Sequence, residues 1–123
     1  MNSAVVASDL LARALAAGGA MLAAVGVGLS AYAAHVAAGE GQAAMQMAAL
    51  FALVHGAALA ALAPRATRWL ARMALSAMAL GVVLFSGSLG AAHFLAAPTT
   101  LAPYGGSLMI LAWLVYAADA LRR

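Results

Sequence analysis

Four long apolar runs, separated by short polar breaks, make up most of this chain. Each run reaches or approaches the roughly 20 residues that an α-helix needs to cross a hydrocarbon layer ~30 Å thick. Every face of each run is apolar, and a helix in hydrocarbon satisfies its own backbone N–H and C=O groups. The pattern therefore predicts an all-α, integral membrane four-helix bundle, a single domain over residues 1–123 with helices at about 10–36, 43–63, 67–97 and 104–121.

The polar breaks carry helix-boundary signals. Ser8 and Asp9 have short polar side chains that cap helices, so we expect the first helix to begin just after them. The glycine-rich stretch 38–42 predicts a loop, because glycine favours turns. Prolines do not continue a helix interior and predict the remaining boundaries: Pro64, Pro98 and Pro103.

The composition agrees with a membrane environment. Hydrophobic residues make up 67% of the chain and charged residues 7%, whereas about a quarter of a soluble domain is charged. A helical bundle in water needs a polar outer face, and none of the runs provides one. We therefore expect a lipid bilayer around the protein. The 12 glycines let helix backbones approach closely, which favours self-association or binding to other membrane subunits.

The arginines predict the orientation. With four spans, all six lie on the side of the two termini and of the connection between the second and third helices: Arg13, Arg65, Arg68, Arg72, Arg122 and Arg123. The positive-inside rule makes this side cytoplasmic. We expect Arg72 to extend to that surface with Asp119 as its partner. Scattered arginines form no basic stripe, so no nucleic acid is expected as a ligand.

The first run also permits a second interpretation. Ala31-Tyr32-Ala33 fits the cleavage site of a secretory signal, and cleavage there would leave three helices. The run is longer than the about 7–15 residues of a typical signal core. We therefore expect it to be retained as a helix.

Three polar side chains are candidates for an intramembrane site, because polar groups are costly in a bilayer and are often functional. They are His55 in the second helix and Ser86 and Ser88 in the third. His55 is either a proton-accepting or ligand-contacting group or a neutral ring that hydrogen-bonds a neighbouring helix. The hydrophobic core contains no carboxylate to complete a proton relay, which favours the second interpretation.

A second candidate cluster lies at the outer face, where His35, Glu40 and His93 come to similar depth. Their side-chain types suit a metal ion. No local spacing of histidines supports such a site, and the absence of cysteine excludes thiolate ligands and disulfides. We expect no metal and no cofactor.

Small residues in the predicted helices indicate close helix contacts. Ser86 and Gly90 share one face of the third helix at i, i+4 spacing; a broken helix that exposes its backbone to a substrate is the alternative. Trp113 lies too deep for an interfacial anchor and is expected to pack internally. The expected packing positions are Gly26, Ser30, Gly87, Gly90, Gly105 and Gly106.

Four segments followed by a tryptophan form a more specific signature: Ser30-Ala31-Tyr32-Ala33-Ala34-His35, residues 51–59, Phe85-Ser86-Gly87-Ser88-Leu89, Pro103-Tyr104-Gly105-Gly106 and Trp113. In this order, and over about residues 15–118, the chain resembles the small membrane family catalogued as domain of unknown function 423, which is related to eukaryotic transmembrane protein 256. The resemblance implies four helices in a bacterial inner membrane and no established reaction.

The chain departs from that family at several positions. Ser30 and Ala33 stand where the family has glycines, and Phe51 and Ala52 replace a Tyr-Gln pair. Gly90 replaces a tyrosine. These changes remove polar groups from the places where a site would need them.

The expected function is therefore structural. Sparse intramembrane polarity favours a non-catalytic accessory protein, either a homo-oligomer or a small subunit of a larger membrane complex. The alternative is a small-solute or ion channel or transporter with a polar path near His55, Ser86 and Ser88. We do not expect an enzyme, because no nucleophile, base and metal grouping is present in the sequence.

Overall fold

The computed structural model describes residues 2–122, which contain helices and no strand. Its elements are α1 (Ser3–His35), α2 (Glu40–Leu62), the short 3₁₀ helix η1 (Ala63–Arg65), α3 (Trp69–Leu95) and α4 (Ala102–Leu121). The prediction of four helices in an all-α chain is confirmed, and each helix is long and apolar enough to cross a membrane.

The first helix begins earlier than predicted. Asn2 caps it, because its side-chain oxygen accepts a hydrogen bond from the Ala4 N–H at 2.9 Å. Ser8 lies inside α1 and donates its hydroxyl to the Val5 carbonyl, so its polar group is satisfied without a helix end. The prediction that Ser8 and Asp9 mark the start of the helix is wrong.

The first connection is shorter than the predicted loop 38–42. Gly39 precedes α2 with φ +64°, a left-handed conformation that glycine adopts without steric cost. Gly41 and Gln42 already belong to α2, and the Gln42 amide donates to the Ala33 carbonyl at 3.0 Å. This bond joins the end of α1 to the first turn of α2.

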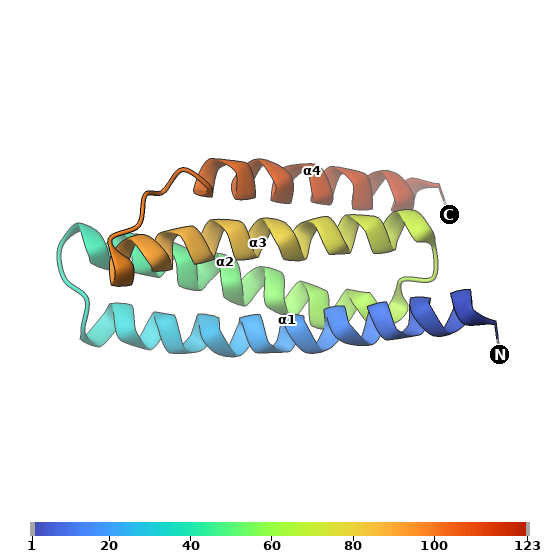
Figure 1. Ribbon diagram of the computed structural model, residues 1–123, viewed down its shortest axis with the longest axis horizontal. Coiled ribbons are helices and arrows are strands. Elements are labelled where there is room, and N and C mark those ends of the chain that lie inside the picture. Colours follow the sequence, from blue (N-terminus) through green and yellow to red (C-terminus); the bar gives the residue numbers. More distant parts are fainter. Residues whose placement is uncertain (1, 123) are drawn as a thin grey trace.

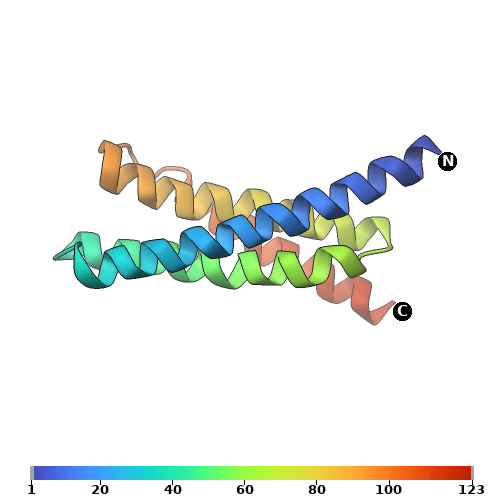
Figure 2. The same cartoon turned by 90° about the horizontal axis from the view of Figure 1, so that it is seen from below.

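The four helices run antiparallel to their chain neighbours, and α1 and α4 lie on opposite sides of α2 and α3 (Figure 1). Seen from below, α1 crosses in front of the other helices (Figure 2). In an 18-residue stretch of each helix, 39% of the residues of α2 and of α3 are buried, against 22% for α4 and 11% for α1. Both termini and η1 lie at one end of the molecule, which we term the arginine end (Figure 1).

The backbones of α1 and α2 touch at glycines. A Cβ on Gly56 would lie 2.5 Å from the Gly19 carbonyl oxygen, and one on Gly19 would lie 2.7 Å from the Gly56 carbonyl oxygen. Gly26 repeats the contact two turns further along, with the Leu53 amide nitrogen 2.7 Å from a built Cβ. Such distances leave no room for a side chain, so these glycines set the spacing of the helix pair.

The backbones of α3 and α4 also touch at glycines. A Cβ on Gly105 would lie 2.6 Å from the Gly81 carbonyl oxygen and 2.5 Å from the Phe85 amide nitrogen. A Cβ on Gly81 would meet the Gly105 carbonyl oxygen at 2.9 Å. The two helix hairpins of the chain are therefore each joined by direct contact of main chain with main chain.

The predicted packing positions divide into two groups. Gly26 and Gly105 lie in close contacts, whereas Ser30 is exposed and a Cβ on Gly87 or Gly90 would meet nothing within 4 Å. Gly106 has only the Phe85 ring nearby, at 3.9 Å. The expectation of close packing is wrong at Ser30, Gly87 and Gly90, because Ser30 is exposed and the two glycines border open space, whereas Gly106 makes only an ordinary van der Waals contact with Phe85 of α3.

The arginine end also holds the main hydrophobic cluster and an ion pair between described residues. The fully buried members of the cluster include Leu59, Leu75 and Met78 from α2 and α3. Arg68 Nε lies 3.0 Å from Asp119 Oδ1, and Asp119 is completely buried. The expected partner of Asp119 was Arg72, but the Nε–H of Arg72 donates to the Ala66 carbonyl instead. The ion pair joins the start of α3 to the end of α4.

Substitution of Gly56 by alanine tests the glycine contacts. We expect Gly56→Ala to destabilise the protein by about 1–3 kcal/mol, because the new methyl group overpacks against the α1 backbone. Gly28→Ala is the matched control, since a Cβ there meets nothing within 4 Å. Thermal unfolding in a mild detergent, followed by circular dichroism, measures both; equal midpoints would contradict the role of Gly56.

Candidate functional site

His55 is the buried polar residue at the centre of the molecule, with 6% of its surface exposed. Its Nδ1 lies 2.9 Å from the Phe51 carbonyl oxygen, one turn back on α2. Its Nε2 lies 3.1 Å from the indole Nε1 of Trp113 on α4. The Phe51 ring stacks on the imidazole with an interplanar angle of 9°.

These two partners fix the protonation state of the His55 ring. A carbonyl oxygen only accepts hydrogen bonds and an indole N–H only donates them. Nδ1 therefore carries the proton, and Nε2 accepts from Trp113. This is the neutral Nδ1–H tautomer, in which both ring nitrogens of His55 are used. The geometry corresponds to the interhelical hydrogen-bonding interpretation of His55.

Ser86 and Ser88 do not join His55 in one polar path. The Ser86 hydroxyl donates to the Ala48 carbonyl of α2 at 2.9 Å. Ser88 is buried, and its hydroxyl oxygen has no hydrogen-bond partner among residues 2–122. The two serines are two positions apart on a helix, so they point to different sides of α3. His55 and Ser86 thus serve separate helix contacts, and Ser88 joins neither of them.

The outer cluster predicted from His35, Glu40 and His93 does not form a metal site. His35 and Glu40 are exposed, and His93 Nε2 lies 2.8 Å from the Tyr32 hydroxyl. A Cβ on Gly41 would lie 3.0 Å from the His93 ring, so glycine allows the ring to rest on α2. In the described part of the chain, no three His, Cys, Asp or Glu residues gather closely enough to hold a metal ion.

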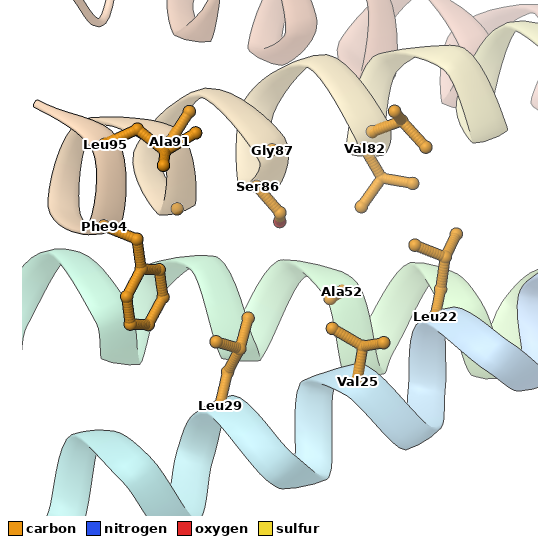
Figure 3. Close-up of a pocket in the computed structure, with 12 residues that line it drawn as sticks. Leu22, Val25, Leu29, Ala52, Val82, Ser86, Gly87, Ala91, Phe94 and Leu95 are labelled. Atoms are coloured by element: carbon orange, nitrogen blue, oxygen red, sulfur yellow. The ribbon is translucent and has the colours of Figure 1, made fainter. Parts of the chain in front are cut away.

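The largest pocket lies between α1 and α3 and has a volume of about 490 Å³. Leu22, Val25 and Leu29 of α1 point across it toward α3, where Ser86 is its one hydroxyl (Figure 3). The ring of Phe94 packs on Tyr32 with centroids 5.2 Å apart and narrows one end. Since the hydroxyl proton of Ser86 is already donated to Ala48, the pocket offers an apolar surface to a ligand.

Aromatic residues connect three helices around His55, and the sequence pattern did not single out this group. Phe85 of α3 packs on Phe51 of α2 with centroids 4.7 Å apart, and Trp113 of α4 lies 6.0 Å from the imidazole. The expectation that Trp113 packs internally is wrong: the residue is 37% exposed, although its N–H is directed to His55. The depth of Trp113 in its span was the one sequence feature that could have indicated its membership in this group. Its pairing with His55 depends on tertiary structure.

The hydrogen bonds of His55 give a direct spectroscopic prediction. Nitrogen-15 NMR of the protein near neutral pH should show a protonated Nδ1 and an unprotonated Nε2. Trp113→Phe removes the donor to Nε2 and should lower the free energy of unfolding by about 0.6–1.7 kcal/mol. Trp69→Phe is the control, because Trp69 is 66% exposed. A doubly protonated ring, or equal effects of both substitutions, would refute this geometry.

Comparison with known proteins gives one match. A family model described as "Protein of unknown function (DUF423)" matches residues 29–106, which contain Tyr32, His55, Ser86 and His93. No curated protein and no solved structure matches the chain significantly. The matched region is more than half of the 123 residues and includes α2 and α3 in full. The chain therefore belongs to the DUF423 family.

Proposed function

We propose that the protein is a multi-pass protein of a bacterial inner membrane with both termini in the cytoplasm. All four helices are long and apolar enough to span a bilayer. Large apolar side chains are exposed on all four helices; Val25 is 54% exposed, Leu53 37%, Leu80 56% and Ile110 65%. Water would solvate such surfaces poorly, whereas lipid tails match them.

The orientation rests on charge. The described arginines all lie at the arginine end of the antiparallel helices. The connections at the opposite end, residues 36–39 and 96–101, contain no basic residue. A basic excess in short loops favours the cytoplasmic side.

Within the membrane, we propose a non-catalytic accessory role: the protein associates with copies of itself or with the helices of a larger complex. One observation carries this proposal. The hydrogen-bonding groups of His55 and Ser86 are engaged within and between the protein's own helices, and Ser88 is buried, while most residues of the flanking helices α1 and α4 are not buried. The chemistry left for a partner is therefore apolar packing.

The same bonds weigh against a channel or transporter. A polar path needs groups that exchange partners with a solute, but both ring nitrogens of His55 and the hydroxyl proton of Ser86 are engaged. Pumps and transporters commonly use a membrane-embedded carboxylate relay. The buried carboxylate here, Asp119, is bound to Arg68 near the end of the helices.

Single cysteines in this cysteine-free chain test insertion and orientation. We expect Ala38→Cys and Thr100→Cys, which are exposed opposite the arginine end, to react with a membrane-impermeant maleimide in intact spheroplasts. Thr67→Cys, exposed at the arginine end, should react only after the membrane is permeabilised. The reversed pattern would refute the orientation. Recovery of the protein from the soluble fraction would refute insertion.

Native mass spectrometry after extraction in mild detergent tests the accessory role. We expect the protein in a homo-oligomer or in a complex with other membrane subunits, because α1 and α4 leave most of their surface open. Reconstituted vesicles should show no ion or proton flux above protein-free vesicles. A lone monomer under every extraction condition would contradict the accessory role, and flux abolished by His55→Ala would favour the channel.

A further inference from the structure

A row of hollows, which we term the furrow, lies along the seam between α1 and α3 and extends beyond the pocket that Ser86 lines. Three hollows follow one another from the arginine end, with volumes of about 380, 180 and 490 Å³. Leu22 and Val83 line both the second and the third hollow, so these two are contiguous. Leu11 and Ser76 of the first hollow lie one helical turn from Ala14 and Ala79 of the second.

The first hollow of the furrow contains a basic residue and polar groups, whereas the other two hollows are apolar. Arg72, Ser76 and the 66% exposed Trp69 line the first hollow, together with Leu11 and Met73. The rest of the furrow is lined by apolar residues and glycines, apart from Ser86, whose hydroxyl is bonded to Ala48. A ligand that fits both parts carries an anion at one end and a long hydrocarbon chain at the other.

The guanidinium group of Arg72 is oriented so that it can bind such an anion. Its Nε–H donates to the Ala66 carbonyl at 2.9 Å, which fixes the plane of the guanidinium group. Guanidinium has five N–H donors in a rigid fork that suits phosphate oxygens. The neighbouring Arg68 differs, because its charge is paired with Asp119. Ser76 adds a hydroxyl to the hollow, although its own proton is donated to the Arg72 carbonyl.

The size of the furrow selects a hydrocarbon chain over a helix. The third hollow extends along α3 from Val82 to Leu95, about 20 Å at the helical rise of ~1.5 Å per residue. Its volume of about 490 Å³ is well below that of an α-helix with side chains, which at ~10–12 Å across would fill more than about 1,500 Å³ over the same length.

The position of the furrow along the membrane normal also suits a membrane lipid. Val82, where the third hollow begins, lies ten residues beyond Arg72 on α3, a rise of about 15 Å. This is about half of a ~30 Å hydrocarbon core. A lipid of the leaflet at the arginine end would thus place its headgroup at Arg72, and one acyl chain would enter the third hollow near the middle of the membrane.

We propose that the α1/α3 furrow binds one anionic phospholipid, with the phosphate at Arg72 and Trp69 and one acyl chain past Gly18 toward Gly87. The proposal depends on the membrane insertion proposed above. Gly18, Gly87 and Gly90 have a structural role in it: they leave the furrow open, because none has a neighbour within 4 Å of its Cβ position.

Native mass spectrometry with added lipid tests the site. The full chain, delipidated in mild detergent, is titrated with phosphatidylglycerol or phosphatidylcholine of identical acyl chains. We expect one phosphatidylglycerol per chain, bound about fivefold more tightly than phosphatidylcholine, the factor that one arginine near an anionic group provides. Arg72→Gln should abolish this preference, whereas Arg65→Gln, at an exposed position outside the furrow, should retain it.

Two glycine variants test the acyl chain. Gly18→Leu fills the second hollow and should weaken binding of both lipids, whereas Gly28→Leu adds the same side chain to exposed surface of the same helix outside the furrow. Circular dichroism confirms that each variant is folded. Equal effects of the two variants, equal wild-type affinity for both lipids, or glycerol phosphate binding as well as phosphatidylglycerol would overturn the proposal.

Two further outcomes distinguish failure of the lipid site from failure of the proposed membrane insertion. A wild-type dimer that Gly18→Leu dissociates would assign the furrow to a second copy of the chain and refute the lipid site. Failure of membrane insertion would appear in the cysteine labelling of intact spheroplasts, whereas failure of the lipid site alone would leave that labelling unchanged.

Discussion

Direct contact of backbone with backbone at glycines is the constraint on which this fold depends. At Gly19 with Gly56, and at Gly81 with Gly105, a single added carbon would lie within 3 Å of the facing main chain. Where lipid surrounds the helices, the hydrophobic effect gives little drive for association, and close van der Waals contact replaces it. The chain therefore forms two tight hairpins, α1–α2 and α3–α4, before any polar group contributes.

The remaining features follow from how the hairpins meet. They join through α2 and α3, with Ser86 bonded to Ala48, and the Trp113–His55 bond adds a link from α4 to α2. The contact between α1 and α3 is slight by comparison. A furrow therefore remains along that seam. Ser86, His55 and Asp119 hold helices together, and the surfaces left for other molecules include the furrow and the apolar outer faces of α1 and α4.

The sequence predicted the number and type of elements because four uninterrupted apolar runs have few other solutions in lipid. It failed where the outcome depends on which side of a helix faces a neighbour. Gly87 and Gly90 resembled packing residues, yet they border open space, while Gly19, Gly56 and Gly81 were not singled out although they make close contacts. When every face of a helix is apolar, no periodicity shows which small residue meets another helix. The partners of His55 and Asp119 likewise depend on tertiary packing.

Hydrogen exchange of the backbone amides, measured with the protein in lipid nanodiscs, tests most directly whether lipid completes this structure. In an 18-residue stretch of each helix, only 11% of the α1 residues and 22% of the α4 residues are buried by protein, against 39% for α2 and α3. If lipid covers the open faces, the central amides of α1 and α4 should exchange as slowly as those of α2 and α3. Rapid exchange confined to α1 and α4 would show that water reaches them and would contradict a four-span membrane protein.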